Sequence, residues 1–308
     1  MNSLNSVLTI FVMIGIGYIL TKKGLFNQQT GKLFSKLILN ITLPLMMIVN
    51  IPMRFSRESL FNSLNGIIVA FLSIIIIYGI AIIISYIFKI EEDKRGIFCI
   101  MFTFGNSIFI GLPINISLFG EGSTMYVFLY YFAHTTLFWT LGVYNIKKNT
   151  QEDKKKNLKL KSLKKIFSPP FIGFIIGIII MLMNIDLPGF IEDSFRYIGS
   201  ITTPLSMFFI GIVIHSIKME DIKLDIKSCL ILFGRFVVAP IIMFLGLKLY
   251  ELPQLLKNVF IIESAMPIIT QAALVAEFYD TDSKYVAIMV GFTTILSIIV
   301  VPIYSFIL

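Results

Sequence analysis

Ten apolar stretches, each close to the length that a helix needs to cross a bilayer, follow one another along this chain of 308 residues. A spanning helix requires about 20 consecutive, predominantly apolar residues. The stretches are bounded by charged residues and run approximately over 4–21, 33–52, 65–88, 97–119, 124–146, 168–184, 193–217, 227–249, 255–278 and 284–307. The second is the least clear, because Lys32 and Lys36 mark its start. The pattern predicts an all-α membrane protein with ten transmembrane helices.

The composition supports a bilayer as the solvent of this chain. Hydrophobic residues make up 56% of it and charged residues only 14%, whereas about a quarter of an average soluble protein is charged. The net charge of +8 would suggest a nucleic-acid partner in a soluble protein, but here the basic residues lie between the apolar stretches. We therefore expect no nucleic-acid partner. The two cysteines, Cys99 and Cys229, and the two histidines lack metal-ligand spacing, so we expect neither a disulfide nor a metal site.

The distribution of lysine and arginine predicts the orientation. With both termini outside, the inner loops carry 19 of these residues and the outer loops five, as the positive-inside rule requires. No basic residue precedes the first stretch and Lys22-Lys23 follows it, which indicates a retained helix instead of a cleaved signal peptide. We expect a multi-pass protein of the plasma membrane with its N-terminus and C-terminus outside.

A polar, lysine-rich segment divides the chain into two halves of five helices. Residues 147–167 are expected to form a cytoplasmic basic linker, with lipid recognition by its lysines as the weaker alternative, between a first repeat at 1–146 and a second at 168–308. Ile41–Met47 and Ile201–Met207 share five of seven residues at an offset of 160. Because five is odd, the halves must have opposite orientations. Such inverted repeats are typical of secondary transporters.

Two stretches in corresponding positions of the halves are interrupted. The fourth contains two glycines, two asparagines and a proline between Gly105 and Asn115, and the ninth contains Pro267 within Glu263–Gln271. A broken helix exposes N–H groups on one side, which attract a carboxylate, and C=O groups on the other, which attract a cation. Paired broken helices indicate a transporter binding site, whereas a simple proline kink in each helix is the alternative.

Three ionisable residues lie deep within apolar stretches. Burial of charge in a bilayer is costly, which makes function the first hypothesis for Glu263 and Arg235. Glu263 could bind sodium or carry a proton, and Arg235 could bind substrate; a purely structural Arg235–Glu263 pair is the alternative. His134 is interpreted as an interior histidine without a binding function.

Several motifs together resemble the auxin efflux carrier family, which includes plant auxin exporters and short bacterial carriers for malate or malonate. They are Gly24-Leu25, Leu43-Pro44, Gly105-Asn106-Ser107 with Gly111-Leu112-Pro113, and Ala265-Met266-Pro267. The resemblance implies an architecture similar to bile-acid symporters and sodium/proton antiporters, with broken helices 4 and 9 crossing. Helices 1, 2, 6 and 7 would form a scaffold and a homodimer interface, and helices 3–5 and 8–10 a mobile transport domain. Glu263 and Gln271 resemble the sodium-binding ninth helix of the bile-acid symporters.

Together these features predict an elevator-type secondary transporter for a small organic anion, such as malate, malonate or an auxin-like acid. The candidate substrate-binding residues are Asn106, Ser107, Asn115, Thr42, Arg235, Ser264, Thr270 and Gln271. Gly111, Pro113 and Pro267 would form the crossover hinge, and Glu263 would bind a coupling sodium ion or proton. We expect no other cofactor. The alternatives are a membrane sensor or a channel-like protein; no HExxH, GxSxG or paired-aspartate motif indicates an enzyme.

Overall fold

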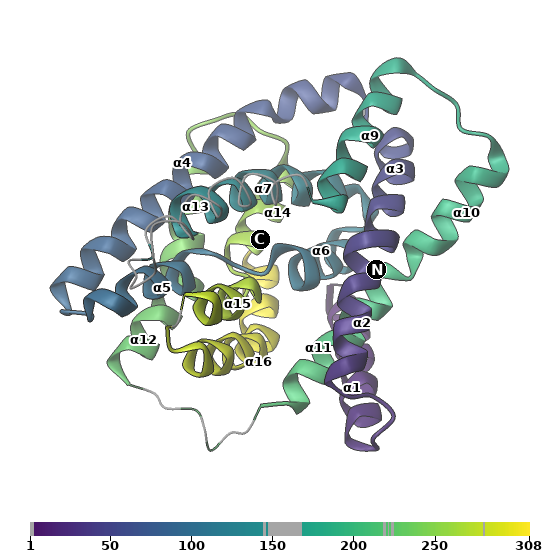
Figure 1. Ribbon diagram of the computed structural model, residues 1–308. Coiled ribbons are helices and arrows are strands. Elements are labelled where there is room, and N and C mark those ends of the chain that lie inside the picture. The colour runs from purple at the N-terminus through teal and green to yellow at the C-terminus, as the bar shows by residue number, and fades with distance from the viewer. Residues whose placement is uncertain are drawn as a thin grey trace, which may run out of the picture.

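The computed structural model describes residues 3–143, 146, 168–217, 220, 222, 225–279 and 281–308, and within them the chain is helical apart from connecting segments and one isolated bridge (Figure 1). The predicted basic linker at 147–167, and with it nine of the lysines used to orient the chain, lies outside the described residues.

Helices occupy the ten predicted apolar stretches. In the first half they are α1 (Ser3–Lys22), α2 (Gln28–Leu37) with η1 (Ile38–Thr42) and α3 (Leu43–Arg54), α4 (Arg57–Ile87), α5 (Glu92–Thr103), η2 (Ser107–Gly111) with α6 (Leu112–Phe119), η3 (Glu121–Ser123), and α7 (Thr124–Leu137) with η4 (Phe138–Gly142). In the second half they are α9 (Pro169–Met183), α10 (Gly189–Ser200), α11 (Thr202–His215), α12 (Ile226–Phe233) with η6 (Gly234–Val238) and α13 (Ala239–Leu247), α14 (Gln254–Ser264), α15 (Gln271–Phe278) and α16 (Ser283–Ile307).

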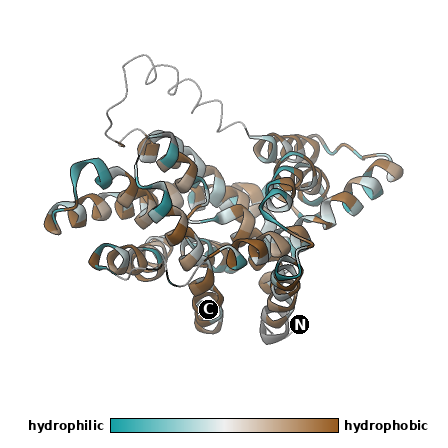
Figure 2. Cartoon of the chain, turned by 60° about the horizontal axis from the view of Figure 1, so that its bottom comes forward, coloured by the Kyte–Doolittle hydropathy of each residue, from teal (hydrophilic) through white to brown (hydrophobic). Residues whose placement is uncertain are grey.

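Several of these helices are suited to a bilayer. Five helical runs in the described residues are long and apolar enough to span a bilayer: Gln28–Arg54, Arg57–Ile87, Gly189–His215, Ile226–Leu247 and Ser283–Ile307. Shorter apolar helices cover Leu8–Lys22, Ser107–Phe119 and Pro169–Met183. Large apolar side chains such as Leu72, Ile83 and Ile179 are exposed on the outside of the bundle, where Figure 2 shows hydrophobic residues on many outward faces. The chain is therefore a multi-pass membrane protein, while the count of ten spans stays a prediction.

One helix begins well before its apolar stretch. The third stretch was expected to start at residue 65, but α4 starts at Arg57 because Ser56 and Ser59 form a reciprocal capping box. The first turns of α4 are polar, so the apolar pattern of the sequence did not reveal where this helix starts. At 31 residues, α4 is about 46 Å long and exceeds the thickness of a hydrocarbon core.

Prolines within three of the spans are accommodated by a widened helical turn. The π-helical segments η1, η2 and η6 each end two residues before a proline, at Pro44, Pro113 and Pro240 respectively. Proline cannot donate to the carbonyl four residues earlier and clashes with it in a regular α-helix. In η6 the freed carbonyl of Phe236 accepts a hydrogen bond from the Tyr304 hydroxyl at 2.6 Å. These prolines therefore lie within continuous helices and do not end them.

The helices pack in two groups, which lie on opposite sides of Figure 1. The α1/α11 group contains α1, α2, α3, α9, α10 and α11, in which α1 packs on α11 and α3 packs on α9 and α10. The α4/α13 group contains α4 to α7 and α12 to α16, in which α4 packs on α5, α7 and α13. The family resemblance assigns the α1/α11 group to a scaffold and the α4/α13 group to a transport domain, and this assignment stays a prediction.

Some positions that are 160 residues apart make similar contacts. Gly17 of α1 and Gly177 of α9 are 160 residues apart, and a Cβ at either would lie 2.8 Å from backbone, of Phe208 in α11 and of Met47 in α3 respectively. Small residues allow such close approach of membrane helices. Thr42 and Thr202, also 160 apart, meet directly, because the Thr202 hydroxyl donates to Thr42 Oγ1 at 2.8 Å. The repeat offset of the sequence thus recurs in the packing.

Candidate functional site

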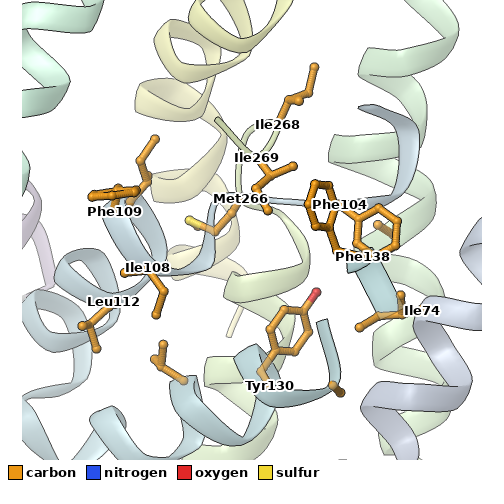
Figure 3. Close-up of a cluster of buried hydrophobic side chains, with 14 of the residues drawn as sticks. Ile74, Phe104, Ile108, Phe109, Leu112, Tyr130, Phe138, Met266, Ile268 and Ile269 are labelled. Carbon is orange, nitrogen blue, oxygen red and sulfur yellow. The ribbon is translucent and has the colours of Figure 1, made fainter. Parts of the chain in front are cut away.

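Two non-helical segments, Phe104–Asn106 and Ala265–Ile269, cross within the α4/α13 group and are called the crossover below. They run antiparallel, with a bridge between Gly105 and Ile268. The Asn106 N–H donates to Pro267 O at 2.7 Å, and the Ile269 N–H donates to Phe104 O at 3.0 Å. The helical stretches at 97–119 and 255–278 are therefore broken, as the sequence predicts, and they cross, as the family resemblance implies. Figure 3 shows the apolar packing around this point, where Ile269 lies next to Phe104 and the side chain of Ile268 points away from it.

Arg235 joins the carboxyl ends of both broken helices. Its side chain is fully buried, and its Nε donates to Met266 O at 3.0 Å. Its two terminal nitrogens donate to the carbonyls of Thr103 and Ser264, the last residues of α5 and α14. A cation is favourable there, because helix C-termini carry partial negative charge. The rigid guanidinium fork allows one side chain to reach all three carbonyls. Gly105 is required beside it, because a Cβ there would lie 2.8 Å from Arg235 Nη2.

Two side chains that sequence reasoning did not assign to the site also hold the crossover. His134 of α7 is fully buried and accepts a hydrogen bond from the Gly105 N–H at 2.9 Å through Nε2. This bond requires the tautomer that carries its proton on Nδ1. Thr293 of α16 accepts from the Ile268 N–H at 3.1 Å through its hydroxyl oxygen. The sequence signal for both residues was a polar side chain within an apolar helix. Their partners could not be found from the sequence, because they are backbone N–H groups of another segment.

Glu263 lies beside the other broken helix. It is fully buried, and its Oε1 accepts a hydrogen bond from Asn115 Nδ2 at 2.8 Å. The same amide donates to Gly111 O at 2.9 Å. A Cβ at Gly111 would overlap both carboxylate oxygens, so only glycine fits there. Among the described residues no ion pair joins Glu263 to Arg235, and the two side chains have different hydrogen-bond partners.

Asn106 combines a capping role with a free donor. Its Oδ1 accepts from the Phe109 N–H at 3.2 Å and so caps the start of η2. Its Nδ2 has no hydrogen-bond partner, although the side chain is only 2% exposed. A buried amide donor without a partner costs about 1–3 kcal/mol, which suggests that a ligand supplies the missing acceptor.

The structure brings most of the predicted site residues together and separates a few. Those at the crossover or directly beside it are Asn106, Ser107, Gly111, Asn115, Arg235, Glu263, Ser264 and Pro267. Thr270 and Gln271 lie at the start of α15, partly exposed, with their side chains 3.3 Å apart. Pro113 lies within α6, beyond the break, and Thr42 lies in the α1/α11 group against Thr202.

A small apolar pocket of about 30 Å³ lies between η2, α6 and α16 on one side and α1 and α11 on the other. Ile110 and Ile114 line one wall, and Ile10, Ile14 and Ile210 line the other. Nearby, the rings of Phe109 and Phe209 lie 5.2 Å apart. The two groups therefore meet here through apolar side chains, which impose few directional bonds.

Comparison with known proteins shows which family and which relatives this chain resembles. The family described as "Membrane transport protein" matches residues 3–305. An uncharacterized transporter, MJ1031, of Methanocaldococcus jannaschii is 27% identical over 308 residues, which cover 98% of this chain and 97% of that protein. An uncharacterized transporter of Methanothermobacter thermautotrophicus is 21% identical and covers 100% of this chain and 99% of its own length. The uncharacterized transporter YfdV of Escherichia coli K12 is 21% identical over 70% of both chains.

Proposed function

Because the chain belongs to the membrane transport protein family, the family of the auxin efflux carriers, we propose that it is a secondary transporter that moves a small organic anion across the plasma membrane. The observation that carries this proposal is the antiparallel crossover, in which a buried asparagine amide lacks an acceptor. Malate, malonate and an auxin-like acid are the candidate substrates.

The anion would bind at the amino ends of the two resumed helices. Asn106 Nδ2 supplies one donor, and η2 and α15 both begin at the crossover, where helix N–H groups favour negative charge. Thr270 and Gln271 at the start of α15 would add polar contacts. Arg235 would act indirectly, because its donors are directed at the carbonyls of the opposite helix ends. Its positive charge would still favour an anion nearby.

Transport would follow an elevator mechanism. The α4/α13 group, which holds the crossover, would move against the α1/α11 group, which would also form the homodimer interface. The apolar contact of η2 and α6 with α1 and α11 supports sliding, since no ion pair has to break there in the described residues. The equivalent contacts at an offset of 160 residues support an inverted repeat, which provides two related states.

The second halves of the two broken helices are exposed to different degrees. This difference indicates which conformational state of the transport cycle the structure represents. On α6, Leu112 and Asn115 are fully buried, and the helix packs on α1 and α11. On α15, which packs on α16 and α5, Leu274 is 67% exposed. With both termini outside, α6 lies in the outer half of the membrane and α15 in the inner half. The structure would then be closed outside and open inside.

The experiment that tests this function is thermal stability of the purified protein with a panel of mono- and dicarboxylates. A ligand that binds the folded state raises its apparent stability. We expect one acid to raise Tm in the wild type and in Asn62→Ala, an exposed asparagine of α4, but not in Asn106→Ala. If the acid raised the Tm of Asn106→Ala by the same amount, the crossover would not be its binding site. If no acid raised the Tm of the wild type, the anion assignment would be contradicted.

A further inference from the structure

Two arginines connect the two groups of helices at one end of the molecule. Arg54, the last residue of α3, forms an ion pair with Glu121 in η3, which packs on α6, α7 and α14. Arg57, the first residue of α4, donates a hydrogen bond to the carbonyl of Leu182 near the end of α9. The first contact reaches from the α1/α11 group to the α4/α13 group, and the second reaches back.

These contacts lie beside a short covalent connection between the groups. Only Phe55 and Ser56 join α3 to α4, and Ser56 caps α4 through its bonds with Ser59. The ring of Phe55 packs edge to face on Tyr126 of α7, with ring centroids 5.8 Å apart. Directed contacts therefore hold the groups together where the chain passes between them.

Much of the rest of the boundary is less directional. The rings of Phe128 in α7 and Phe174 in α9 are stacked at 5.6 Å, and apolar stacking has no fixed partner atoms. The hydroxyls of Tyr131 and Ser168 are 3.5 Å apart, which is long for a hydrogen bond. An ion pair, in contrast, requires its charged atoms within about 4 Å. A movement of η3 away from α3 by a few ångström would break it.

We propose that Arg54, Arg57 and Glu121 form an outer clamp, which stabilises the state that is closed outside and is released when the site opens outward. The clamp rests on the proposed function and on the topology with both termini outside. Because α6 leads directly into η3, and Ile114 of α6 lies against α1 and α11, opening on this side requires η3 to leave α3. The second arginine suits its partner, since the last carbonyls of a helix lack intrahelical donors and favour a cation.

The exposure of the clamp makes it weak, as a carrier that must cycle between states requires. The side chains of Arg54 and Glu121 are 43% and 44% exposed. Ion pairs of this kind contribute little and are screened by salt. Loss of the pair should therefore change the ratio of closed to open molecules by roughly two- to fivefold, without abolishing either state.

Labelling of a cysteine on α6 measures opening without any carboxylate. The full-length protein would carry Cys229→Ser, which removes the exposed cysteine, and Ile114→Cys, whose native side chain is 7% exposed. Adding Arg54→Gln should make this cysteine react roughly two- to fivefold faster with an impermeant thiol reagent applied outside. Arg57→Gln should change the rate in the same direction.

Two further variants separate the clamp from a general loss of stability. Exchange of the charges, with Arg54→Glu and Glu121→Arg together, should return the labelling rate to that of the parent. Arg196→Gln is the matched control and should leave the rate unchanged. The ion pair of Arg196 with Asp193 is similarly exposed, but both residues belong to α10, so it does not join the groups.

The other outcomes each overturn the clamp or separate it from the proposed function. An unchanged rate in Arg54→Gln, an equal acceleration in Arg196→Gln, or no recovery on charge exchange would overturn it. Acceleration only with reagent on the inner side would overturn its assignment to the outer face. Labelling that responds as expected, in a protein that transports no acid, would leave the clamp standing while the proposed function fails. Saturable uptake of an acid with labelling that ignores Arg54 would do the reverse.

Discussion

Some glycines at or beside the crossover have no space for a larger side chain, and Gly111 is the clearest example. Its Cα faces the Glu263 carboxylate, and an added Cβ would overlap both oxygens. Overpacking of this kind costs typically about 1–3 kcal/mol, and here it would also displace a buried charge from its amide donor. Gly79 of α4 provides the contrast, because a Cβ there would meet no atom within 4 Å.

We therefore predict that Gly111→Ala lowers Tm and abolishes transport, whereas Gly79→Ala leaves both unchanged or slightly raises Tm. Thermal unfolding of the two purified variants and uptake in cells would measure this. A fully active Gly111→Ala variant would show that the carboxylate does not occupy the position described.

His134 offers a second prediction at this scale. Its Nε2 accepts the Gly105 N–H, and a buried N–H that loses its acceptor costs about 1–3 kcal/mol. His134→Phe should lower the free energy of unfolding by that amount, while His134→Gln, whose side-chain oxygen can accept, should recover part of it. The comparison needs only Tm values of the two variants. Equal loss in both would mean that ring packing against Phe104 and Tyr130, and not the hydrogen bond, is what stabilises the crossover.

At the scale of helices, Arg235 links two chain breaks that are 161 residues apart, at Thr103 and Ser264. Lysine would keep the charge but cannot bond three carbonyls in the same fixed geometry. We predict that Arg235→Lys lowers Tm and slows transport, whereas Arg196→Lys, on the exposed face of α10, changes neither. Fluorescence-detected gel filtration after heating would rank the variants. An unaffected Arg235→Lys would mean that charge alone holds the helix ends.

Exposure of α15 gives a prediction about orientation. In a Cys229→Ser background, which removes the exposed native cysteine, Leu274→Cys should react with a membrane-impermeant thiol reagent from the cytoplasmic side. Ile114→Cys on α6, where Ile114 is 7% exposed, should react slowly from either side. Labelling of Leu274→Cys only from outside would contradict either the topology or the conformational state assigned to the structure.

The sequence predicted the elements well because apolar length and helix-breaking residues are local signals. The break in the fourth stretch was predicted from the glycines, asparagines and proline between Gly105 and Asn115, and the break in the ninth stretch from Pro267. The position of Pro113 within a helix was not predicted, because a π-helical turn accommodates this proline without ending the helix. The partners of Arg235 and His134 could not be predicted either, since they are backbone groups, which every residue carries.

Over the whole molecule, two groups of helices meet across an apolar boundary, and only one of them holds the crossover. An offset of 160 residues appears both in the sequence and in the contacts of Gly17, Gly177, Thr42 and Thr202. That arrangement suits a carrier, which must alternate between two related states.

The most direct test of the carrier is uptake of a labelled carboxylate, chosen by the stability screen, into proteoliposomes. We predict that uptake saturates with concentration, is accelerated by unlabelled acid inside the vesicles, and is lost in Asn106→Ala but retained in Asn62→Ala. Uptake that rises linearly without acceleration would indicate a channel. Uptake no greater than in protein-free liposomes, for every acid that binds, would contradict transport of an organic anion.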